Sequence, residues 1–191
     1  MQQPCEPFFP LLTNAARSAV IKALKKGPAL MKQDLFLIIP ANIPENRLLE
    51  RFGQLCLKTP PQAVLYETAN QPDKQARHVI EAIQARNSAV ILKEDVAGAL
   101  SLQADGVQIV YGSDIKKIRK QIGEMALGVL CVSRDEAMRA GEAGADYIGF
   151  DGENAAELTQ WWSELFTLPC VDFNLDCPSD AADFQVQVLT G

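Results

Sequence analysis

The chain has 191 residues, a formal net charge of −6 at pH 7 and a pI near 4.9. With 48% hydrophobic and 22% charged residues, it is long and apolar enough to bury a substantial core. The acidic balance argues against nucleic acid as a partner, and the basic run Lys116 to Lys120 is interpreted as a solvated helix face. No apolar run approaches the roughly 18 to 20 residues that span a bilayer, so no membrane partner is expected.

The N-terminus and the cysteines indicate the compartment. Residues 1–7 lack the basic start and apolar stretch of a signal peptide. An odd number of cysteines without a Cys-x-x-Cys pair argues against a disulfide framework. These cysteines are Cys5, Cys56, Cys131, Cys170 and Cys177. Cys131 and Cys170 lie in apolar runs, where a thiol acts as a small hydrophobe. The single histidine, His78, has no cysteine near it in sequence, which argues against a zinc-type site. We expect a cytoplasmic protein with reduced thiols.

The chain opens with a Pro-rich segment, residues 1–13, which is predicted to be an irregular arm, and continues with a predicted helix from Asn14 to Lys26. Beyond these, short apolar runs alternate with helical patterns. The predicted strands are 35–39, 63–66, 89–92, 107–110, 127–132, 147–150, 170–173 and 184–188. The predicted helices are 44–57, 73–86, 96–102, 114–122, 134–142 and 155–166.

This alternation predicts a parallel sheet with right-handed crossovers. Eight strands that are mostly apolar throughout indicate one small (β/α)₈ TIM barrel spanning residues 1–191. The alternative, an open doubly wound sheet, is disfavoured because no Gly-x-Gly-x-x-Gly follows the first strand. The final strand ends at Leu189-Thr-Gly191, so the last helix is expected to be missing. Residues 14–26 would then cover the seam, or the barrel would be partly bare there.

A weak internal repeat organises the second half of the chain. Ala-Asp followed by a strand occurs at Asp105, Asp146 and Asp183, which lie 41 and 37 residues apart. The aspartates precede the fourth, sixth and eighth strands, at the barrel face associated with stability, and are interpreted as turn and cap residues. Before Asp146, Gly141 and Gly144 are predicted to form a helix C-cap.

Function in this fold belongs to the loops that follow the C-terminal ends of the strands. We expect a small-molecule ligand at this mouth of the barrel. The candidate ligand-binding residues are Glu67, Lys93, Tyr111, Ser133, Asp151 and Asn174. The carboxylates of Glu94, Asp95 and Asp114 are candidate ligands for Mg²⁺, the one cofactor considered. Asp95 and Asp114 are equally read as N-caps of the helices that follow them.

Four segments resemble a known family: Val90-Ile-Leu-Lys-Glu-Asp-Val96, Ala99 to Ile109, Gly128-Val129 and Glu136 to Phe150. Together they make the stretch from Ala89 to Phe150 similar to the thiamine-phosphate synthase family, which includes the related thiazole tautomerases. The resemblance implies a TIM barrel. It also implies an enzyme that joins hydroxymethylpyrimidine diphosphate to a thiazole phosphate and releases pyrophosphate with the help of Mg²⁺.

The sequence departs from the family where the family holds its phosphates. After the second strand, Val64-Leu-Tyr-Glu-Thr68 replaces the family's Gln-x-Arg-x-Lys. After the third, Lys93-Glu-Asp95 replaces Asn-Asp-Asp. After the fourth, Val110-Tyr-Gly-Ser113 replaces Gly-Gln-x-Asp, and Asp114 is displaced by one position.

The later loops differ in the same way. Asp151-Gly-Glu-Asn154 replaces Thr-x-Thr-Lys, residues 172–176 replace a glycine-rich phosphate loop, and Val132 stands where a tautomerase has its histidine. Each charge-assisted contact to a developing anion that is lost costs roughly 2 to 4 kcal/mol. These departures predict a family scaffold without its phosphate site.

These observations leave two alternative hypotheses for the function. The first is a non-catalytic, divergent homologue that binds a less anionic ligand or a partner at an acidic mouth. The acidic residues of that mouth are Glu67, Glu94, Asp95, Asp151, Glu153, Asp172 and Asp176. The alternative is an active synthase or tautomerase with a rearranged site, in which Lys93 is catalytic and Mg²⁺ is held by the candidate carboxylates. In either case the seam near Phe8, Phe9 and Leu11 is an interface between copies, or the arm covers its own seam.

Overall fold

A computed structural model describes residues 34–68 and 73–190, and the predicted N-terminal arm and helix lie outside these residues. The strands are β1 (Asp34–Ile39), β2 (Ala63–Tyr66), β3 (Ala89–Lys93), β4 (Gly106–Val110), β5 (Ala126–Cys131), β6 (Tyr147–Phe150), β7 (Cys170–Asp172) and β8 (Phe184–Val188). The helices are α2 (Glu45–Lys58), α3 (Asp73–Gln84), α4 (Val96–Ser101), α5 (Ile115–Ile122), α6 (Arg134–Glu142) and α7 (Ala155–Leu165). The predicted elements agree with these within one or two residues.

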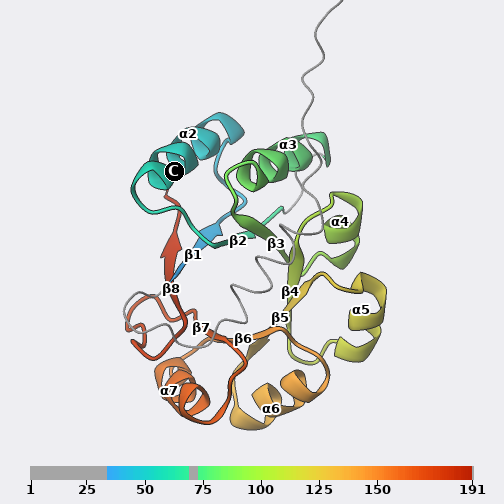
Figure 1. Cartoon of the computed structure of the whole chain (residues 1–191), viewed down its shortest axis with the longest axis vertical. Helices are drawn as coiled ribbons and strands as arrows, with labels where there is room; N and C mark the ends of the chain where they lie inside the picture. The colour runs from blue at the N-terminus through green and yellow to red at the C-terminus, as the bar shows by residue number, and fades with distance from the viewer. Residues whose placement is uncertain (1–33, 69–72, 191) are drawn as a thin grey trace, which may run out of the picture.

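The strands form a closed parallel barrel in the order β1 to β8, with the helices around its outside (Figure 1). The ring closes where β8 pairs with β1, from Asp34 opposite Phe184 to Ile38 opposite Val188. The (β/α)₈ prediction is confirmed, and the open-sheet alternative is wrong.

The connection between β7 and β8, residues 173–183, contains no helix, in agreement with the predicted elements, so strands and helices do not alternate strictly here. The buried carboxylate of Asp172 accepts hydrogen bonds from the backbone amides of Asn174 (2.9 Å) and Ser179 (2.8 Å). These bonds hold the connection in turns, since they satisfy its amides through a side chain rather than through a helix.

The outer face of β8 is accordingly polar. Gln185 and Gln187 point away from the barrel and are exposed, while Phe184 and Val186 pack inside it. Strict alternation of this kind is typical of a strand with one face in water. Beside it, a groove of about 230 Å³ between α2 and β8 has Leu37, Leu55 and Leu189 among its lining residues. The predicted cover of this seam, residues 14–26, lies outside the described residues.

Two layers of apolar side chains make the core. One fills the barrel: Phe36, Ala63, Leu65, Ile91, Ala126, Tyr147, Val171 and Phe184. The other lies between the strands and the helices and includes Phe52, Ile80 and Trp162. Inside the barrel, the hydroxyl of Tyr147 donates a hydrogen bond of 2.8 Å to Oε1 of Gln108. These two polar groups can be buried without a large cost in stability because each makes a hydrogen bond with the other.

The repeated aspartates join pairs of strands at the N-terminal end of the barrel. Each carboxylate accepts a hydrogen bond of 2.8 to 2.9 Å from a backbone amide of the preceding strand. Each aspartate's own amide donates to the carbonyl of that same residue. The partners of Asp105, Asp146 and Asp183 are Val90, Leu127 and Cys170, respectively. Their predicted structural role at this face is confirmed, although each carboxylate holds a strand amide and none caps a described helix.

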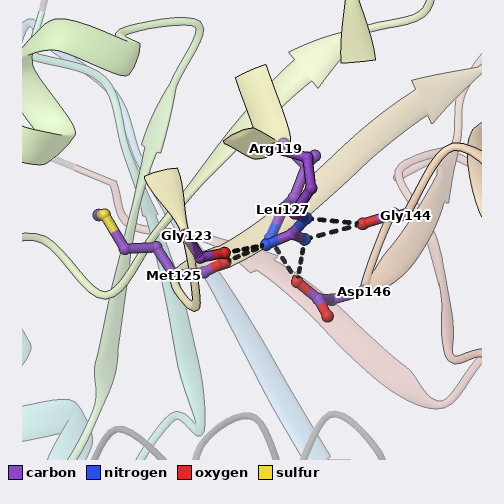
Figure 2. A network of polar contacts seen from close by, with 6 residues as sticks. All are labelled: Arg119, Gly123, Met125, Leu127, Gly144 and Asp146. Carbon is purple, nitrogen blue, oxygen red and sulfur yellow. Dashed lines mark hydrogen bonds and ion pairs between the residues drawn. The ribbon is translucent and has the colours of Figure 1, made fainter. Parts of the chain in front are cut away.

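Arg119 of α5 reinforces the joint that Asp146 makes between β5 and β6 (Figure 2). Its guanidinium donates to the carbonyl oxygens of Gly123 (2.9 Å), Met125 (2.8 Å) and Gly144 (3.0 and 2.8 Å), and it pairs with the carboxylate of Asp146. One side chain therefore ties the ends of α5 and α6 to the starts of β5 and β6.

The two glycines after α6 have different roles. Gly144 has φ +102°, a left-handed conformation that favours glycine, and it ends the helix as predicted. Gly141 lies within α6, and a Cβ there would meet Leu168 and Trp162 at 3.6 and 3.7 Å. The prediction of a C-cap at Gly141 is wrong; its place is in the packing between α6 and α7.

Candidate functional site

At the C-terminal mouth, the structure brings two predicted ligand-binding residues together. Tyr66 and Leu92 are opposite each other in the pairing of β2 with β3, so Glu67 and Lys93 follow side by side. Nζ of Lys93 lies 2.7 Å from Oε1 of Glu67, and both side chains are partly exposed. The positive charge predicted for this mouth is therefore already neutralised within the protein.

Two of the three predicted metal ligands occupy cap positions, and the third, Glu94, directly precedes one of them. Asp95 is the N-cap of α4 and accepts from the amide of Gly98 (2.7 Å), and Asp114 is the N-cap of α5 and accepts from the amide of Lys117 (3.0 Å). The capping interpretation is confirmed for both. Within residues 34–68 and 73–190, no group of three or more His, Cys, Asp or Glu side chains is arranged to hold a metal ion. Mg²⁺ binding by Glu94, Asp95 and Asp114 stays a prediction.

Ser133 is the N-cap of α6, in an arrangement that differs from a capping box by one residue. Its hydroxyl accepts from the amide of Glu136 (3.3 Å), whose carboxylate accepts from the amide of Val132 (2.8 Å). The pattern Ser-x-x-Glu in residues 133–136 is the signal that could have identified this role from the sequence. The structure thus gives Ser133 a local structural role and leaves its ligand-binding role a prediction.

The remaining candidates lie in separate loops. Asp151 accepts from the amide of Gly152 (2.8 Å), and Oδ1 of Asn174 accepts from the amides of Asp176 (3.1 Å) and Cys177 (3.3 Å). Both side chains shape their own turns. Tyr111 packs on the outer side of the barrel and borders a pocket between α5 and α6, away from Lys93.

The sequence interpretation missed a set of apolar residues at the mouth. Side chains alternate along a strand, so positions two residues beyond an inward residue also point inward. Gln108 and Val186 face the interior, which places Val110 and Val188 on the same side at the strand ends. Gly128 faces Tyr147 inside the barrel, so Val132, four residues further along the chain, also points inward.

These residues are exposed as well as apolar. Val110 is 44%, Val132 62% and Val188 38% exposed, and Leu175 in the β7–β8 loop is 51% exposed. They make up four of the eight large hydrophobic side chains that are exposed among the described residues. The mouth set, as we call these four residues, offers apolar contact around a neutralised ion pair. Counting alternate residues to the ends of the predicted strands could have revealed its three valines.

The buried thiols do not supply a nucleophile. Cys131 ends β5 and Cys170 begins β7, and burial raises the pKa of each thiol to about 12. At neutral pH both are protonated, and a protonated thiol is a poor nucleophile. Their predicted behaviour as small hydrophobes agrees with this burial.

Fold and site together define a (β/α)₈-barrel protein with an ion pair and apolar strand ends at its C-terminal mouth. The chain belongs to the thiamine monophosphate synthase family, whose model matches residues 35–153. That match reaches from β1 to the loop after β6, so it also includes the first two strands, for which the sequence motifs gave no strong resemblance. None of the described helices has both the length and the apolar character required to cross a membrane.

Individual relatives match only part of the chain. It is 39% identical over 119 residues to the thiamine-phosphate synthase of Erythrobacter litoralis, covering 51% of this chain and 55% of that protein. It is 40% identical over 80 residues to the thiamine-phosphate synthase of Geobacillus kaustophilus, covering 40% of this chain and 36% of that protein. The chain thus spans about half or less of these relatives' length.

A solved structure extends the similarity of fold to most of the chain. The thiamine phosphate pyrophosphorylase of Pyrococcus furiosus superposes with a TM-score of 0.66 at 16% identity, over 87% of each chain. At this identity the likeness concerns the fold alone.

Proposed function

We propose that this protein is a divergent, non-catalytic member of the family that binds a small, predominantly apolar ligand at the barrel mouth. The observation that carries the proposal is the ion pair between Lys93 and Glu67, together with the exposed apolar strand ends around it. A diphosphate that leaves a substrate needs several unpaired cations, because catalysis of such transfers is mostly charge stabilisation and positioning.

The electrostatics of the mouth disfavour an anionic substrate. Lys93 would have to leave Glu67 before it could pair with a phosphate, and Glu67 would then stand beside the same anion. The loop after β6 adds the exposed carboxylates of Asp151 and Glu153. Two like charges 4 Å apart repel by roughly 1 kcal/mol in water and by about 4 kcal/mol near a protein surface. The mouth therefore favours a neutral or cationic group.

The shape of the mouth supports the same function. Val110 stands where the family has glycine, so an isopropyl group occupies space that the family leaves open. Together with Val132 and Val188 it offers apolar area, and burying such area stabilises a complex by roughly 25 cal/mol per Å². A ligand with an apolar body and one donor or cationic group for Glu67 fits these features.

Catalysis is tested by supplying hydroxymethylpyrimidine diphosphate, thiazole phosphate and Mg²⁺ and measuring pyrophosphate release. We expect no release above that of a protein-free reaction, while the Erythrobacter litoralis relative serves as the positive control. The alternative function, an active synthase with Lys93 as its cation, is favoured by the 39% identity to that relative. Turnover that is lost in Lys93→Ala would establish the alternative and overturn a non-catalytic role.

Ligand binding is tested with N-phenyl-1-naphthylamine, an uncharged probe whose fluorescence rises in apolar surroundings. We expect saturable binding that Val132→Asp weakens at least about fivefold, because a carboxylate replaces apolar area that the probe would cover. Leu57→Asp is the matched control, since Leu57 is 88% exposed at the end of α2, away from the mouth. Equal weakening in both variants, or none in either, would contradict binding at the mouth.

A further inference from the structure

Two adjoining pockets surround the start of α5, outside the barrel mouth. The first, of about 400 Å³, lies between the β4–α5 loop and α6 and has Tyr111, Ser113 and Arg139 among its lining residues. The second, of about 430 Å³, is bordered by Lys117, Lys120 and Gln121. Asp114 and Lys116 border both, so the two pockets form one continuous surface. Each volume lies in the range of small-molecule sites.

This surface carries positive charge on an acidic protein. Its cations are Lys116, Lys117, Lys120 and Arg139, and its carboxylates are Asp114 and Glu142, with Asp135 beside it paired to Arg139. Four cations against three carboxylates leave an excess of one positive charge, in contrast with the net charge of −6 of the whole chain. A local excess of one sign within an opposite overall charge attracts a small anion to that place.

The four cationic side chains of this surface differ in how firmly neighbouring residues hold them. Lys116, Lys117 and Lys120 are exposed and project from one face of α5. Arg139 is held by Asp135 through Nε at 3.1 Å, so one edge of its guanidinium is fixed. Asp114 already accepts the amide of Lys117 as the helix cap, which satisfies part of its carboxylate.

The first pocket also offers apolar contact. The ring of Tyr111 and the side chains of Ile115 and Ala143 border it, and Ile115 is buried. A ligand that binds both there and at the lysines has an aromatic or aliphatic body and an anionic end. The planar guanidinium of Arg139 and the point charge of Lys116 suit the tetrahedral oxygens of phosphate.

We propose that the groove between α5 and α6 binds a small phosphomonoester, with its phosphate between Lys116 and Arg139 and its body on Tyr111. This site is separate from the barrel mouth and independent of what binds there. Phosphate recognition in this chain is thereby assigned to the outside of the barrel.

The test is an NMR titration of the full chain with phenyl phosphate, with inorganic phosphate and phenol in parallel. We expect saturable shifts of the amides of Ser113, Lys116 and Ala143 with phenyl phosphate, weaker binding of inorganic phosphate and none of phenol. Lys116→Gln and Arg139→Gln should each weaken binding about tenfold, as expected for a lost charge-assisted contact.

Lys74→Gln is the matched control, because Lys74 is an exposed lysine on α3, outside the groove. The Lys74→Gln variant should bind phenyl phosphate with the same affinity as the wild type. Equal weakening in Lys74→Gln and Lys116→Gln would show non-specific attraction of anions and overturn the proposal. Shifts centred on Glu67 and Lys93 would place the anion at the mouth and overturn it as well. Unchanged thermal unfolding of each variant confirms that the comparison concerns binding.

Discussion

Replacing Arg119 with methionine is expected to lower the free energy of unfolding by about 3 kcal/mol, because breaking a largely buried ion pair leaves its partner charge uncompensated. The guanidinium reaches the carbonyls of Gly123, Met125 and Gly144 and the carboxylate of Asp146 at once (Figure 2). Methionine fills a similar volume but donates nothing to these oxygens. At about 2 to 4 °C per kcal/mol for a chain of this size, Tm should fall by roughly 6 to 12 °C.

Two further variants separate charge from geometry. Arg119→Lys keeps the charge but loses the planar fork, so it should recover less than half of the loss. Arg139→Met removes an exposed pair with Asp135 on α6 and should leave the unfolding free energy nearly unchanged. Calorimetry or urea unfolding measures all three. Wild-type stability in Arg119→Lys would mean that the positive charge alone accounts for the effect.

The barrel could be predicted from the sequence because its strands carry strong local signals. Runs such as residues 35–39 and 89–92 are apolar on both faces, which separates buried parallel strands from helices. The repeated Ala-Asp pattern indicated a structural role for Asp105, Asp146 and Asp183, and the structure shows that role as a bond to the preceding strand.

The sequence predicted no helix between the seventh and eighth strands, but it did not reveal what holds that connection. Asp172 and Asn174 accept amides along residues 173–183, so side chains satisfy the backbone of these turns. The alternating polar positions Gln185 and Gln187 signalled a polar outer face of β8, although they were interpreted only as part of a strand.

The candidate site was predictable only in part, since position in the fold does not reveal the partners of a side chain. The topology placed Glu67 and Lys93 at the mouth, but their pairing depends on the register of β2 with β3. The groove between α5 and α6 joins Tyr111 to Arg139, residues from separate elements that share no sequence motif. Such a site leaves no pattern in the sequence because it depends on how two neighbouring helices pack against each other.

Replacing Gly128 with alanine should destabilise the protein by about 4 kcal/mol, combining overpacking with the loss of a buried hydrogen bond. A Cβ on Gly128 would lie 2.1 Å from Cζ and 2.3 Å from Oη of Tyr147, which is fully buried inside the barrel. The ring cannot retreat without breaking its 2.8 Å bond to Gln108. Urea unfolding should show the loss as a lower midpoint.

A double-mutant cycle identifies the cause of this effect. In the Tyr147→Leu background the same Gly128→Ala change should cost less than about 1 kcal/mol, because the overlapping ring is gone. Gly53→Ala is the matched control: its Cβ would meet only Nη2 of Arg86, at 3.5 Å, within α2. Alanine should stabilise that helix by up to about 1 kcal/mol. An equal cost of Gly128→Ala in both backgrounds would show that contact with Tyr147 is not what requires glycine there.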